Sequence, residues 1–182
     1  MSGQIIFLNG PSSCGKSTTA RALQDVVELP FWHISIDHLR DSGVLPLARI
    51  DRKDFLWSDM RTPFFDGFHA SLAAYAHAGN NLILEHILDT AEWVPHLKTL
   101  LAPFDVVFVG IHCDLGELRR RELARGNRRV GSAEEDVDTV HKGRVYDIEI
   151  DGRHSARRNA ELILECRRSG LRKSEFANTG RS

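Results

Sequence analysis

The segment "GPSSCGKS" at residues 10–17 follows the apolar run "QIIFLN" and constrains the fold more than any other part of the chain. It matches G-x-x-x-x-G-K-[ST], the phosphate-binding loop that joins a buried strand to a helix. Gly10 and Gly15 allow close approaches and backbone conformations that a Cβ blocks. Ala20 and Leu23 follow with helical spacing. The context therefore fits the motif, and a bound nucleoside triphosphate is expected.

Each fixed position of this phosphate loop has an expected role. The loop amides and the start of the following helix should hold the phosphates. Lys16 should bridge the β- and γ-phosphate oxygens, and the Ser17 hydroxyl should bind Mg²⁺. Cys14 is either a thiolate activated by the helix N-terminus or a small filler, and the filler is favoured. The expected nucleotide-binding residues are Gly10, Ser12, Ser13, Cys14, Gly15, Lys16, Ser17 and Thr18.

Composition points to one soluble globular domain in a chain of 182 residues with 42% hydrophobic and 27% charged residues. The formal net charge of −1 favours neither nucleic acid nor an anionic membrane. Three cysteines without a C-x-x-C pair argue against disulfides and a zinc site. The N-terminus lacks the features of a signal peptide, and no apolar run is long enough to span a bilayer. A cytoplasmic protein without nucleic-acid or membrane partners is expected.

Short apolar runs alternate with amphipathic segments along the chain. Strands are expected at residues 5–8, 31–37, 80–86 and 104–114, with an edge strand at 146–151. Helices are expected at residues 17–27, 62–79, 93–101, 115–125 and 155–168, and residues 41–60 should form a loop with a short helical piece. This alternation predicts a three-layer α/β/α domain with a parallel sheet. Ligands should bind beyond the carboxyl ends of its strands.

Local signals set the expected boundaries of the elements and of the domain. Thr62 and Pro63 resemble an N-cap followed by proline at the first helical position. The buried face of that helix is expected to consist of Phe65, Phe68, Leu72 and Tyr75. The domain should span residues 1–168, and the polar tail at 169–182 should fray.

Asp37 is expected to end the second strand, at the sheet edge where the phosphate loop also lies. Phosphoryl transfer to a hydroxyl needs a carboxylate that orients the acceptor and takes its proton. Asp is also a favoured N-cap, and "HLRDSG" follows directly. Spacing alone leaves both interpretations open.

Glu85 is expected at the end of the third strand, followed by His86. Its carboxylate can hold Mg²⁺ through water, bind the acceptor, or be a solvated charge at a strand end. His86, His112 and Asp114 also lie at expected strand ends, but their spacing matches no standard zinc pattern.

Arginines concentrate in "RRELARGNRRVG", which ends a helix and enters a glycine-flanked segment. We expect a small lid over residues 119–132. Arg125 and Arg128 should close over the transferred phosphate and stabilise its charge. Arg119 and Arg120 are better explained as a solvated helix face paired with Glu117 and Glu122. No aromatic residues interleave, so a nucleic-acid patch is not favoured.

From about residue 4 to 165, the chain resembles the chloramphenicol phosphotransferase-like proteins. The resemblance is carried by "IIFLNGPSSCGKST", "ISIDHLRD", "NLILEH", "FVGIHCDLGELRRRELARGNRRVG" and "VHKGRVYDIEID", in this order. It implies an adenylate-kinase-like P-loop fold that binds ATP with Mg²⁺ and phosphorylates a hydroxyl of a small molecule.

The resemblance also implies roles for individual residues. Asp37 falls at the position of the family's catalytic base. Lys16 and Ser17 fall on its phosphate and magnesium ligands. The lid arginines of the family correspond to Arg121, Arg125 and Arg128, and Arg121 is expected to bind the nucleotide. His141 and Tyr146 match the family pattern too, and packing in the core or lid is expected for them.

Two departures from the family leave the acceptor open. Glu85 and His86 stand where the family's third strand resembles "IIDD", and residues 42–60 show no match. Aromatic residues that can line an acceptor site, or belong to the core, are Phe55, Trp57, Phe64 and Phe65. Chloramphenicol is therefore one possible acceptor, and a nucleoside, sugar or nucleotide sugar is another. A nucleotide-binding switch without catalysis is the third alternative.

Overall fold

Parallel strands form the central sheet of the computed structural model, which describes residues 2–125, 136–137 and 139–177. Within these residues the strand order is β2-β3-β1-β4-β5. The strands are β1 (Gln4–Asn9), β2 (Phe31–Ser35), β3 (Asn81–His86), β4 (Asp105–His112) and β5 (Ile148–Asp151). The expected strands are therefore confirmed, including β5 at an edge.

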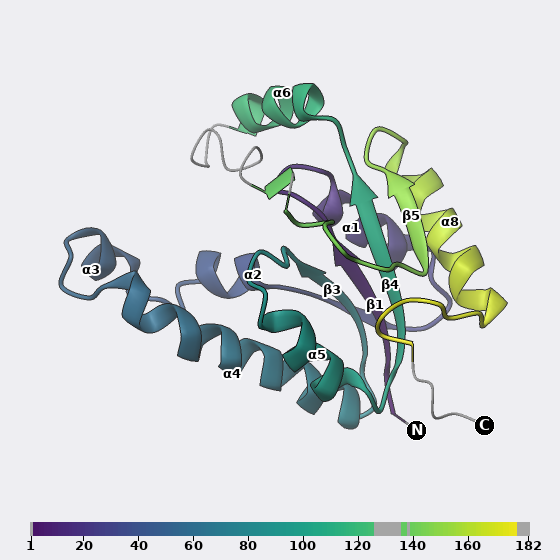
Figure 1. Cartoon of the computed structure of the whole chain (residues 1–182), viewed down its shortest axis with the longest axis horizontal. Helices are drawn as coiled ribbons and strands as arrows, with labels where there is room; N and C mark the ends of the chain where they lie inside the picture. The colour runs from purple at the N-terminus through teal and green to yellow at the C-terminus, as the bar shows by residue number, and fades with distance from the viewer. Residues whose placement is uncertain (1, 126–135, 138, 178–182) are drawn as a thin grey trace.

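Helices cover both faces of this sheet (Figure 1). They are α1 (Lys16–Val26), α2 (Ile36–Asp41), α3 (Leu47–Asp51), α4 (Trp57–His77), α5 (Trp93–Leu101), α6 (Leu115–Arg125) and α8 (Ala156–Ser169). Helices α4 and α5 share one buried cluster with the sheet, and α1 and α8 share the other. The three-layer α/β/α architecture is confirmed. Within the described ranges, no helix combines the length and hydropathy needed to cross a bilayer.

Strand β1 shows why the apolar runs are continuous rather than alternating. Ile5 and Phe7 belong to the cluster beneath α4 and α5, whereas Ile6 and Leu8 belong to the cluster beneath α1 and α8. A strand buried on both faces needs apolar side chains at every position. The run ends at Asn9, where the chain leaves the sheet for the phosphate loop.

The second strand is shorter than expected, because it ends at Ser35 instead of Asp37. The Ser35 side chain accepts a hydrogen bond from the Asp37 amide and caps α2. Ser35 therefore fills the N-cap role that was considered for Asp37, and Asp37 lies in the first turn of the helix.

Helix α4 begins at Trp57, more than a turn before the expected start at Thr62–Pro63. Pro63 lies inside the helix, where it has no amide to donate to the Asp59 carbonyl. The buried residues of α4 are Phe68, His69, Leu72 and Ala76. Tyr75 was wrongly expected in this stripe. It is 40% exposed and packs against Trp32.

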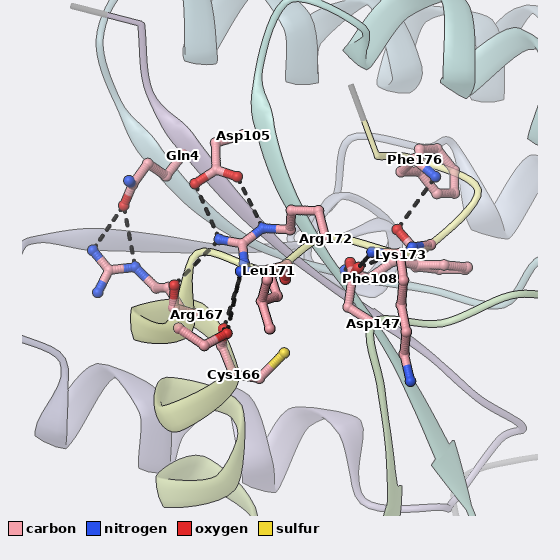
Figure 2. A network of polar contacts seen from close by, with 12 residues as sticks. Gln4, Asp105, Phe108, Asp147, Cys166, Arg167, Leu171, Arg172, Lys173 and Phe176 are labelled. Carbon is pink, nitrogen blue, oxygen red and sulfur yellow. Dashed lines mark hydrogen bonds and ion pairs between the residues drawn. The ribbon is translucent and has the colours of Figure 1, made fainter. Parts of the chain in front are cut away.

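The tail after α8 is anchored on the sheet, so the expectation that it frays is wrong for residues 170–177. Arg172 binds Asp105 with two hydrogen bonds, Nε to Oδ1 at 2.9 Å and Nη2 to Oδ2 at 3.2 Å. Figure 2 shows this pair beside the end of α8, where Arg167 also binds the Gln4 side chain. The tail residue Arg172 thus meets a polar partner at the first residue of β4, and Arg167 at the end of α8 meets one at the first residue of β1.

Asp147 fixes the same tail from a second side. Its Oδ1 accepts the backbone amides of Lys173 and Ser174, and its Oδ2 accepts the Phe108 amide (Figure 2). Beyond this contact Phe176 is buried, with its ring centroid 4.8 Å from that of Phe108. The tail therefore completes the core on the α4 and α5 side of the sheet.

Candidate active site

The phosphate loop turns from β1 into α1 and needs its two glycines for different reasons. Gly15 adopts φ of +105°, a conformation that L side chains rarely adopt. At Gly10 a Cβ would lie 2.6 Å from the Ile111 carbonyl oxygen, so the obstacle is the neighbouring strand. Both reasons agree with the motif's demand for glycine.

Lys16 holds its charge inside the loop. Its ammonium donates hydrogen bonds to the carbonyl oxygens of Gly10 at 2.7 Å and Pro11 at 2.8 Å. The side chain is buried within the loop. A cation held among the loop carbonyls, one residue after the turn at Gly15, is suited to binding a phosphate.

Glu85 lies beside the first turn of α1, where its carboxylate accepts a hydrogen bond from Ser17 Oγ at 2.9 Å. Its other oxygen binds His33 Nε2. Burial opposes ionisation, but the hydrogen bond and charge of His33, together with the Lys16 ammonium, lower the pKa of Glu85 below its ordinary value. Glu85 is buried and partnered, so it is not a solvated charge at a strand end. A hydroxyl beside an ionised carboxylate is a donor set that fits Mg²⁺.

An open cavity lies above these residues. Its phosphate-loop wall consists of Ser12, Ser13, Gly15, Lys16 and Ser17. Asp37 lines the same cavity from the first turn of α2, and its carboxylate lies 3.1 Å from Arg40 Nη1. The structure thus places a carboxylate and the phosphate loop on one cavity.

Aromatic side chains form a further wall of this cavity. Phe65 and Trp93 both line it and stack with ring centroids 4.3 Å apart. The Arg61 guanidinium lies over the two rings, 5.1 Å and 4.6 Å from their centroids, and binds Asp89 at 2.9 Å. Asp89 lines the cavity as well. Trp93 was expected to support a helix, and no pattern in the sequence indicated that it lines a site.

The other aromatic candidates lie outside this wall. Trp57 and Phe64 pack edge to face with centroids 5.7 Å apart, and Phe55 lies beneath the Arg49 guanidinium. Of the four aromatic residues considered for an acceptor site, Phe65 is therefore the one that lines the cavity.

His86 also lines the cavity, and it contacts a histidine in the core. Its Nε2 lies 2.9 Å from Nε2 of His69, and its Nδ1 lies 2.9 Å from the Ile87 carbonyl oxygen. Burial lowers the pKa of His86 to about 4. Burial, followed by the neighbouring histidines, lowers the pKa of His69 to about 3. Both rings are therefore neutral near pH 7.

A second cavity lies on the α6 side of the phosphate loop and is lined by Gly15, Thr18, Arg121 and Gly152, among others. Arg121 Nη2 donates to the Gly152 carbonyl at 2.9 Å, and its Nη1 lies 3.4 Å from the Cys14 carbonyl oxygen. The structure therefore brings Arg121 beside the phosphate loop, and its role in nucleotide binding stays a prediction.

The remaining lid arginines were expected to close over the phosphate. Arg125 ends α6, but its side chain and all of Arg128 lie outside the described residues, as do residues 126–132 of the expected lid. Arg120 pairs with Glu117 at 2.7 Å on the exposed helix face, as expected.

His141 and Tyr146, which were expected to pack in the core or lid, lie near the phosphate loop, and so does Asp136. Tyr146 OH accepts a hydrogen bond from Asn9 Nδ2 at 2.8 Å and lies 2.7 Å from His141 Nδ1. Tyr146 and His141 thus connect the segment that contains them to Asn9 at the end of β1. Asp136 Oδ2 accepts the Ser12 amide at 3.1 Å, a contact for which the sequence offers no signal.

Cys14 is fully buried, and burial raises the pKa of its thiol. An activated thiolate does not fit this environment, and the filler interpretation does. The imagined cluster of His86, His112 and Asp114 does not form either. His112 stacks on His141, with ring centroids 4.0 Å apart, while the Asp114 side chain caps α6.

Comparison with known proteins identifies the family. The family described as "Chloramphenicol phosphotransferase-like protein" matches residues 3–168. The chain belongs to the chloramphenicol phosphotransferase-like family. A relative in two strains of Mycobacterium tuberculosis, provisionally named an O-phosphotransferase, is 30% identical over 168 residues, covering 82% of this chain and 75% of the relative.

Solved structures similar to this family member include three kinases. APS kinase from M. tuberculosis, in complex with AMPPNP and APS, has a TM-score of 0.69 and 17% identity over 92% of this chain and 98% of its own. Gluconokinase from Sinorhizobium meliloti has a TM-score of 0.63 and 20% identity over 90% of this chain and 92% of its own. Shikimate kinase from Aquifex aeolicus has a TM-score of 0.57 and 17% identity over 91% of this chain and 97% of its own. At these identities the likeness establishes the P-loop kinase fold, as the sequence predicted.

Proposed function

We propose that this member of the chloramphenicol phosphotransferase-like family transfers the γ-phosphate of ATP to a hydroxyl of a small molecule. The observation that carries the proposal is that Asp37 and the phosphate loop line one cavity. An acceptor in that cavity contacts a carboxylate on one side and the transferred phosphate on the other. Family membership supports phosphotransfer as the reaction class.

The residues that hold the nucleotide follow from the loop. Backbone amides at residues 12–18 and the N-terminus of α1 receive the phosphates. Lys16 moves from the loop carbonyls to the phosphate oxygens, and Arg121 lies beside the second cavity, which can take the rest of the nucleotide. Ser17 and Glu85 offer the oxygen ligands for Mg²⁺. When bound, Mg²⁺ neutralises charge on the phosphates.

Asp37 acts as the general base in this proposal. Its carboxylate orients the acceptor hydroxyl and takes its proton as the acceptor oxygen bonds to phosphorus. The bond between phosphorus and the bridging oxygen breaks, and ADP leaves with that electron pair. Lys16 stabilises the charge on the phosphoryl group in the transition state, together with Arg125 and Arg128 if they close as the family pattern implies.

The cavity favours an acceptor with a flat apolar part. Phe65 and Trp93 offer stacked aromatic surface, whereas the acids Asp37 and Asp89 can accept hydrogen bonds from hydroxyls. Chloramphenicol combines an aromatic ring with free hydroxyls, so its 3-hydroxyl is the first acceptor to test. Nucleosides also offer a flat ring, while a simple sugar leaves the aromatic wall unused.

A panel of acceptors tests this proposal. The protein is incubated with Mg²⁺, γ-labelled ATP and chloramphenicol, nucleosides or sugars, and labelled product is separated and identified by mass. We expect a phosphorylated acceptor with wild type and none with Lys16→Ala. A protein that binds ATP but forms no phosphorylated product and releases no acceptor-stimulated ADP with any acceptor class is a nucleotide-binding switch, and the proposal then fails.

A further inference from the structure

Three potential metal ligands converge where α4 packs against α5, outside the lining of both cavities described above. They are Asp66 and His69 on α4 and His96 on α5, and their ligand atoms all lie within 4.8 Å of one another. We propose that these residues bind a divalent transition-metal ion, with Zn²⁺ as the preferred one. Two imidazoles and one carboxylate form a donor set typical of such ions.

Hydrogen bonds fix which nitrogen of His69 is available. The Ile87 carbonyl can only accept, so His86 Nδ1 carries a proton and donates to it. His86 is buried and neutral, so its Nε2 has a free lone pair and accepts. The facing His69 Nε2, 2.9 Å away, must therefore carry the proton and donate it. This leaves a lone pair on His69 Nδ1.

That lone pair is buried without a partner. His69 is 0% exposed, and its Nδ1 has no hydrogen-bond partner. Buried polar atoms without a partner are rare in folded proteins because they lose their bonds to water. A metal ion bound by Nδ1 would satisfy this atom. The orphaned nitrogen is thus an observation independent of the clustering of the three residues.

The other two ligands can adjust to an ion that His69 holds in place. Asp66 precedes His69 by three residues, so both lie on one side of α4. Asp66 and His96 are exposed, which leaves their side chains free to close to the roughly 2.0–2.2 Å that Zn²⁺ requires. Three protein ligands leave a fourth position for water. The ion would fasten α4 to α5.

A metal ion bound to His69 would also affect a residue of the cavity wall, because His69 donates a hydrogen bond to His86. An ion on Nδ1 fixes the tautomer in which Nε2 donates to His86, and it strengthens that donor. His86 lines the cavity that contains Asp37. The metal site itself does not depend on the proposed phosphotransfer, because its three ligands are not among the residues that line the cavity of the phosphate loop and Asp37.

Calorimetric titration of the full chain, untagged and stripped with EDTA, tests the site with ZnCl₂ and no nucleotide. We expect one ion per chain. His96→Ala and Asp66→Asn alter exposed side chains and should each weaken binding by about 10- to 100-fold or more. The matched control is His77→Ala, an exposed histidine on the same helix, which should bind as wild type does.

A second readout examines the ligand atom directly. In ¹⁵N NMR spectra of the histidine rings, we expect His69 to carry its proton on Nε2 and its Nδ1 signal to shift when Zn²⁺ is added. Absence of stoichiometric binding overturns the proposal. Equal affinity in wild type, His96→Ala and Asp66→Asn also overturns it, because the ion then binds elsewhere.

Discussion

Ser17 Oγ donates a hydrogen bond to Glu85 Oε2 at 2.9 Å, which joins the first turn of α1 to the carboxyl end of β3. The contact follows from the sheet, because β1 and β3 are neighbours and Leu8 lies opposite Glu85 in their register. The two residues proposed to bind Mg²⁺ are 68 positions apart in sequence and are brought together by this pairing.

Glu85→Gln tests the magnesium site. The amide keeps the size of the side chain but removes the charge that attracts Mg²⁺. We expect the Mg²⁺ concentration for half-maximal activity to rise by about 10- to 100-fold. Activity is measured against Mg²⁺ at fixed ATP, with Glu161→Gln on the surface of α8 as the control. An unchanged Mg²⁺ requirement in Glu85→Gln would remove Glu85 from the site.

Arg172→Ala tests the anchor of the C-terminal tail. The Arg172 side chain is 12% exposed and holds Asp105 with two hydrogen bonds. We expect its loss to lower the free energy of unfolding by about 1–3 kcal/mol in urea titrations. Arg157→Ala breaks an exposed pair with Glu161 and should cost about 0.5 kcal/mol or less. Equal effects of the two variants would show that the contact between Arg172 and Asp105 adds no more stability than an exposed ion pair.

His141 gives the fold a pH dependence. Burial, followed by the charge of His112, lowers the pKa of His141 to about 4 from 6.5. Between these values the unfolded chain binds more protons than the folded one, so the free energy of unfolding falls as pH falls from 6.5 towards 4. A difference of one bound proton changes the free energy of unfolding by at most about 1.4 kcal/mol per pH unit. Because the ring is partly exposed, the expected change is smaller.

Urea titrations between pH 7.5 and 5 compare wild type with His141→Asn, which keeps an acceptor for the Tyr146 hydroxyl. We expect a shallower loss of stability with falling pH in the variant. Parallel curves for the two proteins would assign the acid sensitivity to other groups.

The sequence predicted what depends on local pattern. The phosphate loop follows from fixed glycines, and the strands follow from apolar runs such as Ile5–Leu8. Local pattern in the sequence did not predict the contacts between distant segments. Arg172 meets Asp105 across 67 positions, and the tail was expected to fray because its polar residues show no partner nearby in sequence.

Errors at helix starts have local causes. Asp37 and Ser35 are both good capping residues, and the sequence does not decide which one caps α2. Pro63 favours the first turn of a helix but is tolerated within α4, so it marked the wrong start. The convergence of His69 with His96 depends on how two helices pack, which periodicity alone does not specify.

In the proposed reaction, Asp37 takes the proton of an acceptor bound beside the phosphate loop. The most direct test measures both kcat for phosphoryl transfer and ATP affinity in Asp37→Asn, with Asp41→Asn on the same helix as the control. We predict that kcat in Asp37→Asn falls by about 10²- to 10⁴-fold, that its ATP affinity stays within about two-fold, and that Asp41→Asn behaves as wild type. Full kcat in Asp37→Asn would contradict the account.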